Sequence, residues 1–128
     1  LVYLTLEDWL KSHNESFLTE APEVWQYGPV FADLYHELKA HRSENITAMI
    51  RWFDETPRVD DPEVRASIHR VWEAYRHTPA ARLSDLTHRD GGPWHTVAKS
   101  HNFKVPYGTE IPEHVISGYV RNQTKAVA

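Results

Sequence analysis

The stretch Glu23-Val24-Trp25-Gln26-Tyr27-Gly28-Pro29-Val30 decides the fold of this chain. Trp25 and Tyr27 alternate with smaller or polar residues, a pattern typical of a short extended segment. Gly28 has no Cβ and can adopt backbone angles that are closed to other residues. Pro29 lacks an N–H and has φ fixed near the helical value, which suits the first position of a helix. We therefore expect a buried extended arm that ends where a helix begins.

An amphipathic helix is expected directly after this stretch. Apolar residues recur there at the i, i+3, i+4 and i+7 positions of one helix face, namely Phe31, Leu34, Tyr35 and Leu38. Asp33 lies in the first turn and Lys39 near the last, where each charge is favourable to the helix dipole. The pattern predicts a helix from Pro29 to about Arg42.

Further helices are predicted along the rest of the chain. Asp61 is a good N-cap residue and Pro62 a good first residue, so they begin a helix. One face of this helix is apolar and is expected to pack inward; it holds Val64, Ile68, Val71, Trp72 and Tyr75. The other expected helices cover residues 1–12, a short piece within 43–58, two short segments on either side of Ser84, and segments beginning at Trp94 and Pro112.

These patterns together predict a mostly α, compact single-domain helical fold, with short extended segments near residues 17–27 and 103–107. The chain has 128 residues, of which 25% are charged and 41% hydrophobic, as in an ordinary soluble domain. Its formal net charge of -4 argues against overall binding to nucleic acid. The absence of cysteine suits the cytoplasm, and no segment has the length of a membrane span.

Two short motifs resemble the signatures of the Panacea domain, which occurs in SocA-like antitoxins and phage-associated proteins. The first is Trp25-x-Tyr27-Gly28-Pro29-Val30, followed by a helix with Tyr35. The second is Leu83-Ser84-Asp85-Leu86-Thr87-His88, followed by Pro93-Trp94. The resemblance extends from Leu1 to about Tyr119, and Gly91-Gly92 lengthens the usual loop before Pro93.

The resemblance implies a non-catalytic antitoxin that neutralises a cognate protein toxin by direct contact. It also implies a second role as an adaptor that delivers the toxin to an ATP-dependent protease. Some motif positions are assigned to the fold: Gly28, Pro29, Val30, Leu83, Ser84, Leu86 and Pro93. The others are candidates for contact with the partner: Trp25, Tyr27, Tyr35, Thr87, His88 and Trp94. No cofactor is expected.

The resemblance also concerns the start of the chain. Panacea domains usually carry one more helix before the segment that matches Leu1-Val2-Tyr3, which is apolar from its first residue. We therefore expect that residues 1–128 form a single Panacea-like domain that lacks its N-terminal helix.

Other functions are weighed from the residues themselves. The segment Thr78–His88, with the helix expected at Trp94, resembles a helix-turn-helix, but its small positive excess is weak for a DNA-binding protein. His88, Asp90 and His95 flank one turn and are the best candidates for a metal site, although nothing forces them to converge. Ser84 and Thr87 lie near His88, but no nucleophile elbow or oxyanion loop accompanies them, so catalysis is not expected.

Overall fold

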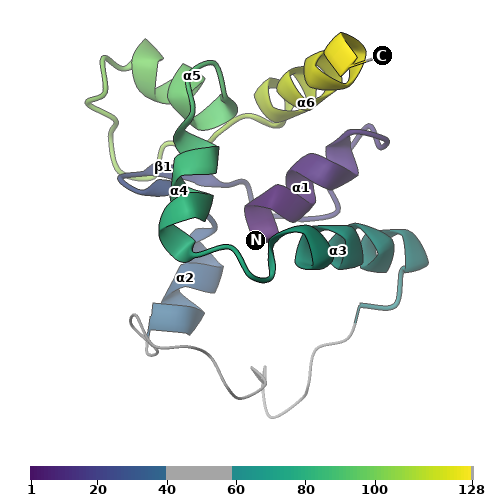
Figure 1. The fold of residues 1–128 in the computed structure, drawn as a ribbon. Helices are drawn as coiled ribbons and strands as arrows, with labels where there is room; N and C mark the ends of the chain where they lie inside the picture. The colour runs from purple at the N-terminus through teal and green to yellow at the C-terminus, as the bar shows by residue number, and fades with distance from the viewer. Residues whose placement is uncertain (40–58, 128) are drawn as a thin grey trace.

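Within residues 1–39 and 59–127, a hairpin and six helices form two groups that share one core (Figure 1). The computed structural model describes residues 1–39 and 59–127. Its helices and strands are α1 (Val2–Leu10), β1 (Glu23–Trp25), β2 (Gly28–Val30), α2 (Ala32–Leu38), α3 (Pro62–Tyr75), α4 (Ala80–His88), α5 (Pro93–Ser100) and α6 (Glu113–Val127). The prediction of a mostly helical fold is confirmed. The short helix predicted within 43–58 lies outside the described residues.

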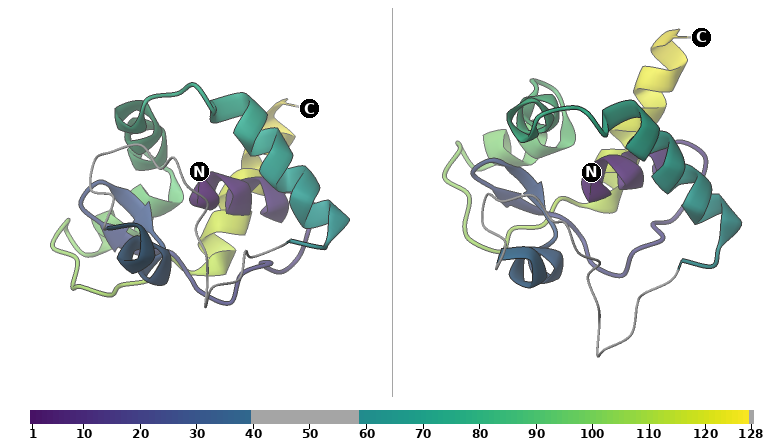
Figure 2. Two further views of the ribbon diagram at one scale, coloured as in Figure 1. Left: turned by 90° about the horizontal axis from the view of Figure 1, so that it is seen from below. Right: turned by 60° about the horizontal axis from the view of Figure 1, so that its bottom comes forward.

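Helix α1 forms the centre of the first group, between α3 and α6 (Figure 2). Its inward residues, among them Leu6 and Leu10, pack with residues that precede and form α6, and the most deeply buried include Ile111, Ile116 and Val120. Burial of each such side chain contributes roughly 1.5–3 kcal/mol. The same core extends to Val24 of the hairpin, so the two groups are held together by apolar packing.

The chain from Glu23 to Val30 forms an antiparallel hairpin rather than an arm that ends in a helix. Glu23 pairs with Val30, Val24 with Pro29 and Trp25 with Gly28, which leaves a two-residue turn. The prediction that Pro29 begins a helix is therefore wrong, because its fixed φ also fits an extended strand. Helix α2 begins at Ala32, and Phe31 before it is buried.

A third segment lies along the outer edge of β1. Val24 N donates to Thr109 O at 2.8 Å, and Ile111 N donates to Pro22 O at 2.7 Å. Glu23 and Glu110 form an isolated bridge. The sequence predicted an extended segment near residues 103–107. In the structure, the residues that pair with the hairpin side are 109–111, just after that segment.

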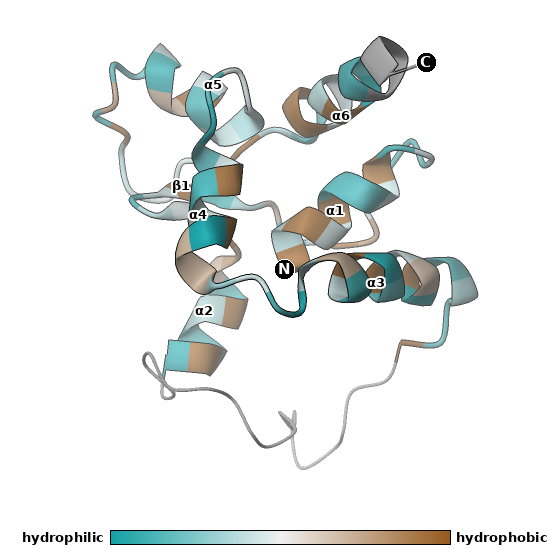
Figure 3. Ribbon diagram, in the orientation of Figure 1, coloured by the Kyte–Doolittle hydropathy of each residue, from teal (hydrophilic) through white to brown (hydrophobic). Residues whose placement is uncertain are grey.

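Helix α3 begins where its sequence predicted. The Asp61 carboxylate accepts hydrogen bonds from the backbone N–H groups of Glu63 and Val64, at 2.8 and 3.4 Å. Val64 and Val71 are buried against α1, but Ile68 and Trp72 are 39% and 49% exposed. The prediction that the whole apolar face packs inward is therefore wrong for these two residues. Polar and apolar residues both lie along α3 in Figure 3.

The segment around Ser84 is one continuous helix. The sequence predicted two short helices with Ser84 as the cap of the second, but Ser84 lies in the middle of α4. Its hydroxyl donates to the backbone of the hairpin instead of capping a helix. In the part of the chain that the structure describes, no helix is both long and apolar enough to cross a membrane.

Candidate partner-binding site

Side chains of α4 and α5 hold the hairpin by three consecutive backbone carbonyls. Trp94 Nε1 donates to Trp25 O at 2.8 Å. His88 Nε2 lies 2.9 Å from Gln26 O, and Ser84 Oγ donates to Tyr27 O at 2.6 Å. All three donors lie far from the hairpin in sequence, so these side chains fix the position of its turn. The two motifs of the sequence therefore meet at one place in the fold.

Gly28 is required where the hairpin approaches α4. Its φ of +130° is rarely adopted by residues with a side chain. A Cβ placed on Gly28 would lie 2.8 Å from Thr87 Oγ1, which is closer than van der Waals contact allows. Thr87 Oγ1 donates to Ser84 O at 2.9 Å, so its hydroxyl is held in this position. This geometry favours a residue without a side chain at position 28.

His88 and Trp94 also contact each other. Their ring centroids are 4.2 Å apart in an edge-to-face arrangement. His88 Nδ1 lies 2.8 Å from Ser84 O, and its other ring nitrogen faces the hairpin. Both side chains are half-buried. The polar atoms of Thr87, His88 and Trp94 thus make contacts within the chain.

The other candidates place aromatic rings at the surface. Tyr27, at the hairpin turn, is 75% exposed, and Tyr35 of α2 is 44% exposed. Trp25 is half-buried and lies against Tyr35, with their ring centroids 4.8 Å apart. We call Trp25, Tyr27 and Tyr35, together with Tyr107, the aromatic surface.

Tyr107 was missed by the sequence analysis. It is 81% exposed, and its ring centroid is 5.7 Å from that of Trp25. The signal was present, because Tyr107 stands between Pro106 and Gly108, and a large aromatic residue within such a turn has little chance of burial. Its proximity to Trp25 depends on the pairing of residues 109–111 with β1, which the sequence does not show.

A pocket of about 330 Å³ opens beside the aromatic surface. Its lining includes Trp25, Trp94, Phe103 and Val105. Phe103 is 57% exposed and has a φ of +61°, an unusual conformation for a bulky residue. Its N–H donates to Ala98 O at 2.8 Å, which holds the turn after α5 in this shape.

His88 and His95, the two histidines considered for a metal site, contact other groups of the protein. His95 Nε2 lies 3.4 Å from Asp90 Oδ1, whereas His88 faces backbone carbonyls. Across residues 1–39 and 59–127, no group of three or more His, Cys, Asp or Glu side chains is arranged to hold a metal ion. Ser84 and His88 also bind the hairpin, so these polar atoms of α4 are not free to contact DNA bases.

The fold and the site describe a small helical protein whose exposed aromatic side chains suit binding to another macromolecule. The model of the family described as "Antitoxin SocA-like, Panacea domain" matches residues 1–95. The chain therefore belongs to the SocA-like Panacea family of antitoxins, which are generally non-enzymatic.

A curated relative agrees with this assignment. The chain is 25% identical over 115 residues to "Antitoxin SocA" of Caulobacter vibrioides (strain NA1000 / CB15N). The similarity covers 83% of the chain and 60% of the relative, so the chain spans about 60% of that protein's length. No solved structure matches the chain.

Proposed function

We propose that this protein is a cytoplasmic antitoxin that neutralises a cognate toxin by direct protein contact, and that the aromatic surface makes that contact. Membership of the antitoxin family supports the first part. The observation that carries the second is the exposure of Tyr27, Tyr35 and Tyr107 around one hairpin.

Exposed tyrosines and tryptophans favour protein contacts for physical reasons. Each buries a large area on binding, loses little side-chain entropy and keeps a polar atom for a hydrogen bond. Trp25 contacts both Tyr35 and Tyr107, with ring centroids at 4.8 and 5.7 Å. Rings that are already packed together lose less freedom when a partner covers them.

We propose a different role for Thr87, His88 and Trp94. Their polar atoms already bond within the chain, and their contacts fix the hairpin that carries Trp25 and Tyr27. They are therefore positioning residues, which prepare the aromatic surface for the toxin without contributing a free polar group to it. Preorganisation of this kind lowers the entropy cost of binding.

Co-expression with the product of the neighbouring gene tests the antitoxin function. We expect this product to stop growth when it is expressed alone and to be harmless with the wild-type chain. A Tyr27→Ala, Tyr35→Ala double variant is expected to lose protection, while Lys99→Ala, which removes an exposed side chain of α5, keeps it. A neighbour that is harmless alone would contradict the antitoxin function. Full protection by the double variant would contradict the proposed contact surface.

Delivery of the toxin to an ATP-dependent protease is the second role that we propose for this chain. It can be separated from simple neutralisation by measuring the half-life of the toxin during co-expression. Delivery predicts that the toxin is degraded faster with the antitoxin than without it, and that this difference disappears in a strain without the protease. Neutralisation by contact alone predicts a stable toxin and continued protection in both strains.

A further inference from the structure

We propose that Glu23 and Glu110, together with the aromatic surface beside them, form a binding site for an arginine side chain of the toxin. The proposal rests on the function proposed above, because it names the chemistry by which that surface would recognise its partner. Glu23 and Glu110 lie directly opposite each other in an antiparallel bridge. We call these two residues the acidic pair.

The two side chains of the acidic pair lie on the same side of the hairpin. The backbone hydrogen bonds of their bridge are donated by the flanking residues Val24 and Ile111. An antiparallel pair that is flanked in this way has its side chains closest together, with Cα atoms about 4.5 Å apart. The acidic pair therefore places two negative charges within reach of one bound cation.

The acidic pair borders the rings of the aromatic surface. Glu23 Oε1 accepts a hydrogen bond from Trp25 Nε1 at 3.0 Å, so this carboxylate lies at the edge of the Trp25 ring. Trp25 in turn contacts Tyr35 and Tyr107, with ring centroids at 4.8 and 5.7 Å. The Tyr107 side chain is 81% exposed, so its ring is open to a partner. Carboxylates and accessible aromatic rings thus meet at one place on the surface.

A guanidinium group matches this combination of side chains. Its planar face stacks on an aromatic ring, and the N–H groups at its edge donate to carboxylates. Tyr107 is held for such a contact by a turn in which Thr109 N and Thr109 Oγ1 both donate to Pro106 O, at 3.2 and 2.7 Å. A metal ion would make no use of the rings, and the described parts of the chain contain no set of three or more side chains arranged to hold one.

Negative charge also predominates in the segments that build this site. Across residues 17–39 and 103–113, six carboxylates stand against two lysines, Lys39 and Lys104. No basic side chain among the described residues forms an ion pair with the acidic pair. Helices α4 and α5 carry further basic residues, but they hold the hairpin at its turn, whereas the acidic pair lies at its open end. A positively charged group of the partner is therefore favoured here.

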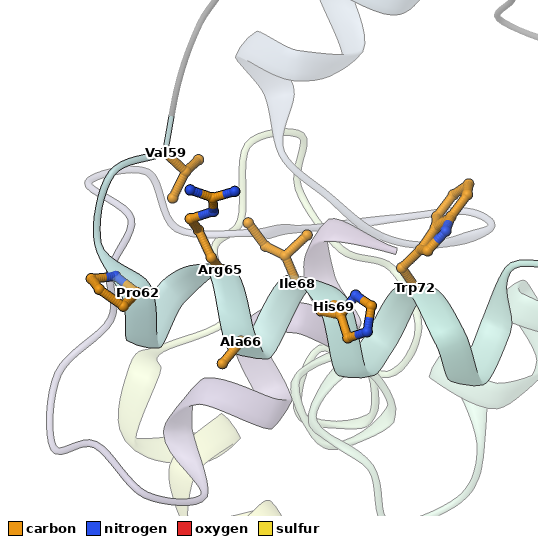
Figure 4. Close-up of a pocket in the computed structure, with 7 residues that line it drawn as sticks. All are labelled: Val59, Pro62, Arg65, Ala66, Ile68, His69 and Trp72. Atoms are coloured by element: carbon orange, nitrogen blue, oxygen red, sulfur yellow. The ribbon is translucent and has the colours of Figure 1, made fainter.

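The outward side of α3 has no such charge bias. Arg65 and Trp72 project from it beside an open hollow of about 680 Å³ (Figure 4). Asp61 lies one turn before Arg65, and Glu73 Oε1 lies 3.8 Å from Arg76 Nη1. Charges of both signs border this hollow, so α3 is a suitable place for a control substitution.

Nuclear magnetic resonance of the isotope-labelled chain tests the chemistry without the toxin. The probe is acetyl-arginine amide, and acetyl-citrulline amide is its uncharged counterpart of nearly the same shape. We expect acetyl-arginine amide to shift the indole N–H signal of Trp25, because that group donates to Glu23. Acetyl-citrulline amide should shift this signal at least about fivefold less. The indole N–H of Trp9, which donates to Glu15 O, is the internal control and should not move.

Calorimetry with the purified toxin tests the partner. The double variant Glu23→Gln, Glu110→Gln keeps the size of both side chains and should weaken binding by about tenfold or more. Glu15→Gln, Glu73→Gln removes two charges at exposed positions elsewhere and should have no effect. Tyr107→Phe should keep the affinity, whereas Tyr107→Leu should lower it about threefold, because only an aromatic ring attracts a cation.

Arginine-to-alanine variants of the toxin identify the occupant. One of them should bind the wild-type chain about tenfold more weakly, yet bind the Glu23→Gln, Glu110→Gln variant as well as the unchanged toxin does. If every toxin variant showed the same loss with both forms of the chain, no toxin arginine would occupy the site.

The results separate this proposal from the antitoxin function. A toxic neighbour that the wild-type chain neutralises, together with unchanged binding by Glu23→Gln, Glu110→Gln, would overturn the arginine site alone. A neighbour that is harmless by itself would overturn the toxin as the occupant, while the Trp25 signal would still report the arginine chemistry. No shift of that signal, or equal shifts with the two amides, would contradict the site. A dimer in sedimentation equilibrium that the double variant dissociates would assign the site to a second copy.

Discussion

The hydroxyl of Ser84 donates a 2.6 Å hydrogen bond to the backbone carbonyl of Tyr27, across a separation of 57 residues in sequence. This contact joins the middle of α4 to the turn of the hairpin. Sequence rules assign Ser84 to a helix cap, but in the structure its hydroxyl makes a tertiary contact. The first prediction concerns this bond.

Ser84→Ala should lower the free energy of unfolding by about 1 kcal/mol, because a single hydrogen bond to a neutral carbonyl is lost. Urea denaturation measures the change. Ser100→Ala is the control, since Ser100 Oγ donates at 2.6 Å to Val97 O of its own helix and joins no separate elements. Hydrogen exchange of the Gly28 amide should become faster in Ser84→Ala and stay unchanged in Ser100→Ala. Equal exchange in the two variants would speak against a role of Ser84 in holding the hairpin.

Gly28→Ala should cost about 1–3 kcal/mol through backbone strain alone, because φ is +130° at this position. The added Cβ would also meet Thr87 Oγ1 at 2.8 Å. Thr87→Ala removes that oxygen, so Gly28→Ala should be less harmful in a Thr87→Ala background. A double-mutant cycle by urea denaturation measures this coupling.

Gly118→Ala is the matched control for this cycle. Gly118 lies within α6, and a Cβ there would meet nothing within 4 Å. This substitution should therefore raise stability by roughly 0.5–1 kcal/mol, since alanine is the better helix former. Strict additivity of the Gly28 and Thr87 changes would show that the two residues do not clash.

The contact between His13 and Glu63 should make stability depend on pH. The hydrogen bond from His13 Nε2 to Glu63 Oε2, at 2.7 Å, raises the pKa of His13 above its usual 6.5. The stabilisation from the raised pKa of His13 is therefore fully present below pH 6.5 and is lost as the pH rises through the pKa of the folded state. Thermal unfolding of the wild type and Glu63→Gln should differ more at pH 6 than at pH 8. A difference that is the same at both values would contradict this linkage.

Glu7 should oppose stability at neutral pH. Burial raises the pKa of its carboxyl above the usual 4.5, because desolvation disfavours the charged form. The folded state therefore binds a proton more tightly than the unfolded state, and stability falls as the pH rises through the pKa of the folded state. Glu7→Gln should raise the melting temperature at pH 7 and have little effect at pH 4. Glu110→Gln, at an exposed carboxylate, provides the control.

Features that the sequence predicted correctly depend on neighbours in the chain. Asp61 and Pro62 begin α3 because a cap and a first helical residue act within one turn. The start of the chain likewise forms a helix, α1, at nearly the predicted bounds.

Features that it missed depend on distant residues. Pro29 suits a helix start and a strand equally, and its pairing with Val24 is part of a hairpin that α4 and α5 hold in place. Ile68 is apolar and correctly spaced for the core, yet α1 covers only the part of α3 around Val64 and Val71. A helical pattern shows which residues share a face but not how much of that face a neighbour covers.

Trp94→Phe tests whether Trp94 positions the hairpin or contacts the toxin directly. The change keeps an aromatic ring near His88 but removes the N–H that donates to Trp25 O at 2.8 Å. We expect a loss of about 1 kcal/mol in stability, faster hydrogen exchange across residues 23–30 and weaker toxin binding. Tyr27→Ala should weaken binding while leaving exchange in the hairpin unchanged, since the Tyr27 side chain is 75% exposed and the variant keeps the backbone carbonyl that accepts from Ser84. Calorimetry with the purified toxin and exchange mass spectrometry measure both quantities. Weaker binding by Trp94→Phe with normal exchange would mean that the toxin touches Trp94 itself, because only a direct contact would lose affinity without any loosening of the hairpin.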